Sequence, residues 1–264
     1  MKKIVVLGLA LIMVVSCLGG CGKSNKKAVS EDTLIVGFDS NFPPYGYKDD
    51  KGEYVGFDLD LAAEVAKRRG WELKLQPIDW NSKDMELNSG TINCIWNGFT
   101  LSDENKDKYT WSKPYVNNSQ VFVVKADSGI KEFKDLAGKA VAVQTASSAL
   151  EALESDDNKE LTASFRELVK VGDYNNAFMN LESGTVDAIA VDIGVAKYQV
   201  ENRDNKYVIL DKVLSPELYA IGFKLGNTEL KDKVEDTLLE MVKDGTFDEI
   251  AKKWDLTESV ILGK

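Results

Sequence analysis

Four stretches of the sequence place polar groups directly after short apolar runs, where a strand would end and a loop begin. They cover residues 39–45, 97–100, 144–148 and 191–194. Carbonyl, hydroxyl and carboxylate oxygens bind cations, whereas free N–H groups at the start of a helix bind anions. Ligands of open α/β sheets lie beyond the carboxyl ends of the strands. Together the four loops therefore predict one cleft.

Each loop offers a different group. Residues 97–100 offer free backbone carbonyls and the Thr100 hydroxyl, and residues 191–194 offer the Asp192 carboxylate. Ser147 or Ser148 is placed to cap a helix.

Simpler structural explanations are open for the same residues. Ser147 and Asp192 can serve only as helix caps, and Phe42, Tyr45 and Trp80 can serve only as packing residues.

The elements that position these loops alternate along the chain. Apolar, β-rich runs predict strands over residues 33–38, 71–75, 94–96, 121–124, 140–143 and 186–191. Apolar spacing and end signals predict helices over residues 58–69, 82–89, 147–153, 175–182, 229–242 and 246–254. This alternation predicts an α/β fold whose sheets are covered by helices.

One segment occurs twice in nearly the same form. Residues 85–95 are MELNSGTINCI and residues 179–189 are MNLESGTVDAI. In both copies a helix is expected to end at a glycine, Gly90 or Gly184, and a buried strand follows. The shared unit predicts two similarly built lobes, each of whose strands leads into one of the polar loops.

Composition excludes several classes of site. The chain has no histidine, and Cys94 is its one cysteine after residue 25. General bases and nucleophilic sites that use histidine are therefore excluded, as are most zinc sites. Loss of Lys2 and Lys3 with a leader would change the formal charge from −10 to −12, which argues against nucleic-acid binding. We expect no metal, no cofactor and no catalysis, and we expect Cys94 to be buried.

The N-terminus has the layout of an export signal. Lys2 and Lys3 precede an apolar stretch over residues 4–15 that is short for a membrane span. Leu18-Gly19-Gly20-Cys21 resembles the lipobox of bacterial lipoproteins, and Cys17 is a second candidate for acylation. We predict a lipoprotein signal over residues 1–20, lipidation at Cys21, and a flexible tether over residues 21–32. Two acyl chains suffice for stable anchoring.

The motifs after residue 33 follow a familiar order. They are Gly37-x-Asp39, Phe42-Pro43-Pro44-Tyr45, Gly56-Phe57-Asp58, Asp79-Trp80, Gly98-Phe99-Thr100, Trp111-Ser112-x-Pro114-Tyr115, Asp135-Leu136-x-Gly138-Lys139 and Gly184-Thr185-Val186-Asp187-Ala188. The set resembles the family 3 bacterial extracellular solute-binding proteins, the amino-acid receptors of ABC importers. The resemblance implies an α/β, two-lobe periplasmic-binding-protein fold of type II, the Venus flytrap. Lobe 1 would comprise residues 33–118 and 216–264, and lobe 2 residues 119–215.

The resemblance also implies roles for single residues. Phe42 would stack on the ligand and Trp80 would form a wall of the pocket. The ligand ammonium would meet Gly98, Thr100 and Asp192, and the ligand carboxylate would meet the N–H groups of Ser147 and Ser148. The candidate ligand-binding residues are Asp39, Phe42, Trp80, Gly98, Phe99, Thr100, Asn105, Ser147, Ser148 and Asp192.

The sequence departs from the family pattern at Asn105. The family has an arginine there that grips the ligand carboxylate, and an amide offers only neutral donors. Ala146 stands where the family prefers glycine. Three interpretations are open: Lys106 supplies the charge, the carboxylate rests on the second lobe alone, or the ligand is not a standard α-amino acid.

We expect a monomeric receptor that is anchored outside the cytoplasmic membrane by its lipid. It would capture a polar amino acid, or a related amine, and deliver it to an ABC permease with a cytoplasmic ATPase. Two other functions are alternatives: an enzyme that evolved on this scaffold, such as a dehydratase, and an extracellular sensing module.

Overall fold

The computed structural model describes residues 32–203 and 206–264, all within one unit, Glu31–Lys264. The predicted signal over residues 1–20, Cys17, Cys21 and the predicted tether except Asp32 lie outside the described residues. No helix in the described part of the chain has the length and apolar character needed to cross a membrane.

The first sheet is built around parallel strands from the N-terminal part of the chain. Its order is β5 (Glu72–Pro77), β1 (Thr33–Phe38), β6 (Cys94–Ile95), β15 (Gly222–Lys224) and β8 (Tyr109–Trp111). Strand β1 pairs in parallel with β5 and β6, and β15 is antiparallel to β6 and β8. The carboxyl ends of β5, β1 and β6 therefore lie at the same edge of the sheet.

The second sheet combines parallel and antiparallel pairs. Its order is β11 (Glu167–Val171), β10 (Ala140–Gln144), β12 (Ala188–Asp192), β9 (Val116–Lys125), β14 (Ser215–Tyr219) and β7 (Thr100–Leu101), and β13 (Tyr207–Ile209) also pairs with β9. Strands β11, β10 and β12 are parallel, and β9 runs antiparallel to β12 and β14. A small third sheet contains β2 (Asn41–Phe42), β3 (Gly46–Lys48) and β4 (Tyr54–Val55).

Helices cover both faces of the two main sheets. They are α1 (Phe57–Arg69), α2 (Lys83–Ser89), α3 (Ser148–Glu154), α4 (Lys159–Ser164), α5 (Tyr174–Ser183), α6 (Ile193–Glu201), α7 (Thr228–Asp244) and α8 (Thr246–Lys253), with 3₁₀ turns at Trp80–Ser82 and Phe133–Leu136. Alternate residues of β10 enter two different cores. Ala140 and Ala142 pack with α5 residues, and Val141 and Val143 pack with α3 residues. Burial on both faces explains why the strands are apolar throughout.

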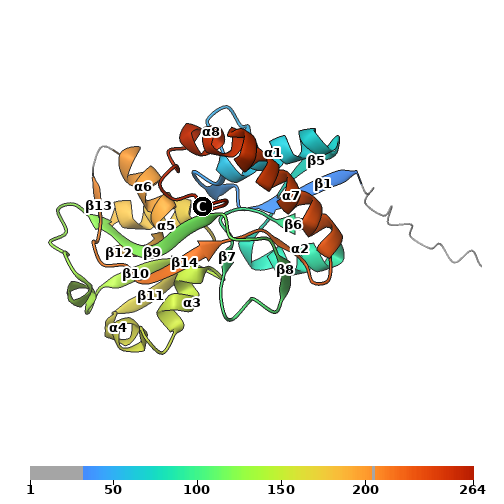
Figure 1. Cartoon of the computed structure of the whole chain (residues 1–264). Coiled ribbons are helices and arrows are strands. Elements are labelled where there is room, and N and C mark those ends of the chain that lie inside the picture. The colour runs from blue at the N-terminus through green and yellow to red at the C-terminus, as the bar shows by residue number, and fades with distance from the viewer. Residues whose placement is uncertain (1–31, 204–205) are drawn as a thin grey trace, which may run out of the picture. The chain divides into compact units, whose positions relative to one another are not determined.

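The last two helices return to the first part of the chain. Helices α7 and α8 contact α1 and lie beside it in Figure 1, near the blue strand β1. Arg68 of α1 donates to Asp244 at the end of α7 at 2.6 Å, and the Trp254 indole donates to Asp60 at 2.7 Å. The C-terminal segment therefore completes the layer over the first sheet, although the predicted division of residues between lobes stays a prediction.

The two copies of the repeated segment have the same local structure. Helices α2 and α5 end at Gly90 and Gly184, both with φ of 79° and both donating to carbonyls of the last helical turn. Leu87 and Leu181 are buried in both copies. The repeat is therefore one helix–turn–strand unit used beside each sheet, as the sequence predicts.

Most predicted elements are confirmed with shifts of one to three residues at their ends. The predicted strand over residues 33–38 matches β1, and the helix over residues 58–69 begins one residue earlier, at Phe57. Cys94 is buried and free, as predicted, and burial raises the pKa of its thiol. The third sheet, α4 and the strands β7, β8, β11, β13 and β15 were not anticipated.

The glycines of the repeat give a matched stability test. Gly90→Ala and Gly184→Ala should each lower the free energy of unfolding by roughly 1–2 kcal/mol, because an L side chain is strained at positive φ. A Cβ at either position would meet no atom within 4 Å, so the cost is conformational. Gly172→Ala is the control, because it too has open space but no positive φ. Urea unfolding curves that do not distinguish the three variants would contradict this explanation.

Candidate functional site

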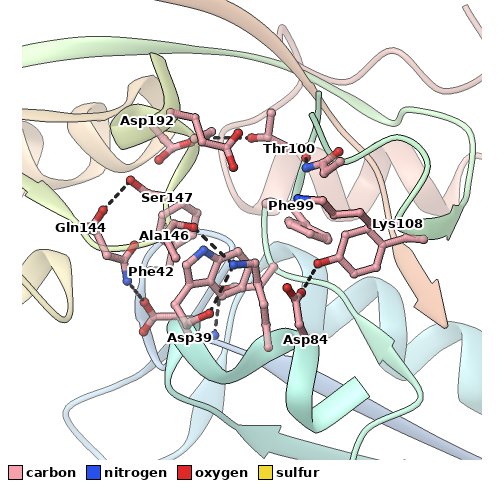
Figure 2. Close-up of a pocket in the computed structure, with 18 residues that line it drawn as sticks. Asp39, Phe42, Asp84, Phe99, Thr100, Lys108, Gln144, Ala146, Ser147 and Asp192 are labelled. Atoms are coloured by element: carbon pink, nitrogen blue, oxygen red, sulfur yellow. Dashed lines mark hydrogen bonds between the residues drawn. The ribbon is translucent and has the colours of Figure 1, made fainter. Parts of the chain in front are cut away.

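A cavity of about 230 Å³ opens where loops from both sheets meet (Figure 2). Its lining contains every candidate residue from the sequence: Asp39, Phe42, Trp80, Gly98, Phe99, Thr100, Asn105, Ser147, Ser148 and Asp192. It also contains Lys83, Asp84, Asn97, Lys108, Tyr109, Gln144, Ala146 and Glu151. The structure thus brings the ten predicted residues together, and their roles in binding stay predictions.

The first sheet delivers its residues from the ends of adjacent parallel strands. Asp39 follows β1, the turn that begins at Trp80 follows β5, and Gly98 lies shortly after β6. The Asn97 side chain joins two of these loops, because its Oδ1 accepts from the Asp39 N–H at 3.0 Å. Convergence of the loops therefore follows from the parallel pairing of β5, β1 and β6.

Gly98 is fixed by a buried carboxyl group. The N–H of Gly98 donates to Asp58 Oδ2 at 2.6 Å, and the Tyr115 hydroxyl donates to Asp58 Oδ1 at 2.8 Å. Burial raises the pKa of Asp58 to about 7, although both hydrogen bonds act in the opposite direction. Gly98 has φ of 55°, and a Cβ there would lie 2.8 Å from the Phe42 ring and 2.9 Å from Tyr219. Only glycine fits this position.

Asp39 connects the loops of the two sheets. Its Oδ2 accepts from Gln144 Nε2 at 2.7 Å, and its Oδ1 accepts from the N–H of Asn41 at 2.8 Å. The side chain is buried, and this burial raises its pKa to about 6. Asp39 therefore holds a desolvated carboxyl group whose hydrogen-bond partners are neutral donors.

Aromatic rings form the apolar wall of the cavity. Phe42 contacts Tyr45 and Tyr174, with ring centroids at 5.7 and 5.9 Å. Trp80 packs edge-on against Phe99 at 5.6 Å and belongs to a buried cluster of the first sheet. For Phe42, Trp80 and Phe99 the packing and pocket-lining interpretations both hold, since each ring is buried and lines the cavity. Tyr45 and Tyr174 are buried and are not among the lining residues.

The loop between β10 and α3 supplies Ala146, Ser147 and Ser148. Ser147 is a helix cap, because its Oγ accepts from the N–H of Leu150 at 3.2 Å. The Thr100 hydroxyl donates to Ser148 Oγ at 3.1 Å, which joins the loop over residues 97–100 to this one. Ala146 has φ of 56°, a left-handed conformation that costs an alanine energy. That conformation explains why glycine is favoured at this position.

Asp192 is at the N-cap position of α6, but its side chain accepts no capping hydrogen bond, so helix capping does not account for its carboxylate. Its Oδ1 accepts from Asn118 Nδ2 at 2.9 Å, from Gln120 Nε2 at 2.7 Å and from the Tyr219 hydroxyl. The register produces this cluster: Gln120 of β9 is opposite Asp192, and Asn118, two residues earlier on the same face, is opposite Glu217 of β14.

Glu217 shares the same two amide donors with Asp192. Its Oε1 accepts from Asn118 Nδ2 and, at 2.8 Å, from Gln120 Nε2. Burial raises the pKa of both carboxyl groups, and the nearby charge of Asp192 raises the pKa of Glu217 further. Glu217 was not identified from sequence, because a strand pairing between positions far apart in the chain places it there.

Asn105 lines the cavity, but both ends of its amide are bound within its own loop. Its Nδ2 donates to the Thr100 carbonyl at 2.8 Å, and its Oδ1 accepts from the N–H of Ser102 at 2.9 Å. Lys106 is exposed, pairs with Asp103 at 2.7 Å and does not line the cavity. The structure therefore argues against Lys106 as the replacement for the missing arginine.

Five lining residues were missed by sequence reasoning: Lys83, Asp84, Lys108, Tyr109 and Glu151. Lys83 lies one helical turn after Trp80, and Glu151 lies three residues after Ser148 in α3. Helical spacing from a predicted site residue was thus an available signal for these two. In Figure 2, Lys108 and Gln144 lie on opposite sides of the cavity.

Comparisons with known proteins agree on one family. The family model described as bacterial extracellular solute-binding proteins, family 3, matches residues 34–257. The L-cystine-binding protein TcyJ of Escherichia coli (strain K12) is 31% identical over 233 residues, which cover 86% of this chain and 84% of that protein. The arginine-binding extracellular protein ArtP of Bacillus subtilis (strain 168) is 32% identical over 254 residues, covering 92% and 96%.

A solved structure shows the same architecture. An ABC uptake transporter substrate-binding protein from Streptococcus pneumoniae, with bound histidine, has a TM-score of 0.81 at 36% identity and covers 85% of this chain and 93% of that one. This similarity confirms the predicted two-lobe fold of type II.

Asp39 makes the stability of the ligand-free protein depend on pH. Its carboxyl group has a pKa of about 6 when folded and about 3.9 when unfolded. The stabilising contribution is therefore fully present below about pH 4 and is lost as the pH rises through 6, by up to roughly 3 kcal/mol. The Asp39→Asn side chain cannot ionise. The free energy of unfolding of this variant should therefore rise relative to that of the wild type as the pH increases from about 4 to 6. If urea unfolding gave the two proteins free energies of unfolding that change equally with pH, the raised pKa assigned to Asp39 would be contradicted.

Proposed function

Because this chain belongs to the bacterial extracellular solute-binding proteins of family 3, we propose that it is the receptor of an ABC importer for an amino acid. It captures a polar amino acid, or a related amine-bearing solute, in the cavity between the two sheets. Closure of a two-lobe protein is a hinge motion, and the ligand favours the closed state by touching both halves.

The observation that carries this proposal is the environment of Asp192. Its carboxylate is buried at the cavity wall and accepts from amides and a hydroxyl, and it forms no ion pair with any described residue. A buried carboxylate without a cation is unfavourable, and a ligand ammonium would relieve that cost. The Thr100 hydroxyl and the Gly98 loop line the same cavity and add oxygen acceptors.

The remaining candidates take the roles that the resemblance implies. Phe42 and Trp80 enclose the ligand side chain, and the loop that holds Ser147 and Ser148 offers N–H groups to the carboxylate. The desolvated carboxyl group of Asp39 favours a side chain that carries a hydrogen-bond donor or a positive charge. This agrees with the ligands named for the relatives, which include arginine and histidine.

Family 3 proteins are extracytoplasmic, and we propose that acylation of Cys21, or of Cys17, anchors this one to the membrane as a monomer. Its protein partners would be a permease and its cytoplasmic ATPase, since relatives belong to ABC transporters. We propose binding without turnover, because the relatives named above are binding proteins.

A thermal-shift screen followed by calorimetry tests the function directly. A solute that binds the native state raises the unfolding temperature by an amount that grows with its concentration. We expect a single-site response to at least one of L-arginine, L-histidine, L-glutamine and L-cystine. Absence of any response among the standard amino acids and cystine would contradict the proposal.

Asp192 should carry the recognition of the ammonium group. Asp192→Asn keeps the shape of the side chain and removes its charge, so affinity for the amino acid found in the screen should fall about 10- to 150-fold, the worth of a hydrogen bond to a charged group. Asp107→Asn removes the same charge from an exposed residue outside the cavity and serves as the control. If calorimetry gave both variants the wild-type affinity, the assignment of Asp192 as the partner of the ligand ammonium would be contradicted.

A further inference from the structure

Two lysines line the cavity, and neither is Lys106, the neighbour of Asn105, where the family has its arginine. Lys83 and Lys108 are the basic residues of the lining, and no arginine is among the lining residues. The arginines are engaged elsewhere: Arg68 with Asp244, Arg69 with Thr237, Arg166 with Asp187 and Arg203 with Glu182. Among the described residues, a ligand carboxylate in this cavity therefore has only these two lysines as cationic partners.

Lys83 is the better placed of the two. It is half-buried in the first turn of α2, whereas Lys108 is exposed. The Lys83 ammonium lies 5.2 Å from the centroid of the Trp80 ring and contacts the carbonyl oxygens of Trp80 at 3.5 Å and Ala146 at 3.3 Å. It thereby connects α2, beside the first sheet, to the loop that follows β10.

The partners of Lys83 are neutral and distant. Both carbonyl contacts are at the long end of the hydrogen-bond range, and Lys83 forms no ion pair with any residue in the described ranges. Asp84 and Glu151 also line the cavity, and their charges act on Lys83 only at longer range. Burial lowers the pKa of the Lys83 ammonium, although the charges of Asp84 and Glu151 act in the opposite direction. An anion placed beside it would supply the missing partner.

We propose that Lys83 binds the carboxylate of the amino acid, in place of the arginine that the family carries at the position of Asn105. This assignment rests on the proposed function and specifies how the same cavity recognises its ligand. A carboxylate at Lys83 would replace the Ala146 carbonyl as the partner of the ammonium. It would then lie beside the loop that carries Ser147 and Ser148, on the other side of the cavity. Lys108, at the rim, adds positive potential and is not the primary partner.

The proposal separates the two ends of a zwitterionic ligand. Asp192 comes from the second sheet and meets the ammonium, and Lys83 comes from α2 and meets the carboxylate. A lysine is a point charge without the fixed geometry of a guanidinium. The carboxylate should therefore contribute through charge more than through paired hydrogen bonds, and its contribution should weaken in salt.

The test compares a free acid with its amide on matched variants. Lys83→Met removes the charge and keeps most of the side-chain length. Lys106→Met is the control, because it removes the same charge from an exposed site that does not line the cavity. Calorimetry on the full chain uses L-arginine, L-glutamine, L-histidine and L-cystine, followed by the α-carboxamide of each amino acid that binds the wild type.

Lys83→Met should bind the free acid about 10- to 150-fold more weakly than the wild type, which is the range for a hydrogen bond to a charged group. The α-carboxamide should lose less than threefold, and Lys106→Met should match the wild type with both compounds. Equal losses for acid and amide, or no loss for either, would overturn the role of Lys83 while the wild type still binds. A wild type that binds none of the standard amino acids and no cystine would overturn the proposed function itself.

Discussion

A buried carboxylate and a half-buried ammonium line one cavity, and neither forms an ion pair with a described residue. Asp192 accepts from two amides and a hydroxyl, and Lys83 contacts two carbonyl oxygens. A protein of this size rarely keeps such charges unpaired, because desolvating each of them costs several kcal/mol. A zwitterion satisfies both at once. The specificity for amino acids that we propose follows because the ligand's ammonium and carboxylate pair with Asp192 and Lys83.

The fold holds these charges in place through strand pairing. Parallel strands of the first sheet end together, so Asp39 and Gly98 converge although they are 59 residues apart. In the second sheet, the pairing of β9 with β12 and β14 sets Gln120 against Asp192 and draws Glu217 to the same amide donors. The repeated helix–turn–strand unit is scaffold, and residues that line the cavity, to which we assign binding, lie just beyond each copy.

Sequence reasoning succeeded where the signal is local. The glycine that ends α2 was predicted from composition and order alone, and the polar loops were predicted from the apolar runs that precede them. It failed where the position depends on tertiary packing. Lys83 is an ordinary helical lysine until α2 is packed beside the β10–α3 loop, and Glu217 acquires its partners only through the register of β14. Asn105 was recognised as a departure, but only the structure shows that its amide serves its own loop.

The most direct test is a crystal structure of the protein grown with the amino acid that stabilises it most. We predict one molecule in the cavity, with its ammonium about 3 Å from the Asp192 carboxylate and its carboxylate about 3 Å from Lys83 Nζ, the usual hydrogen-bond distances. A ligand bound outside the cavity, or one whose carboxylate lies away from Lys83 while its ammonium does not reach Asp192, would contradict the account.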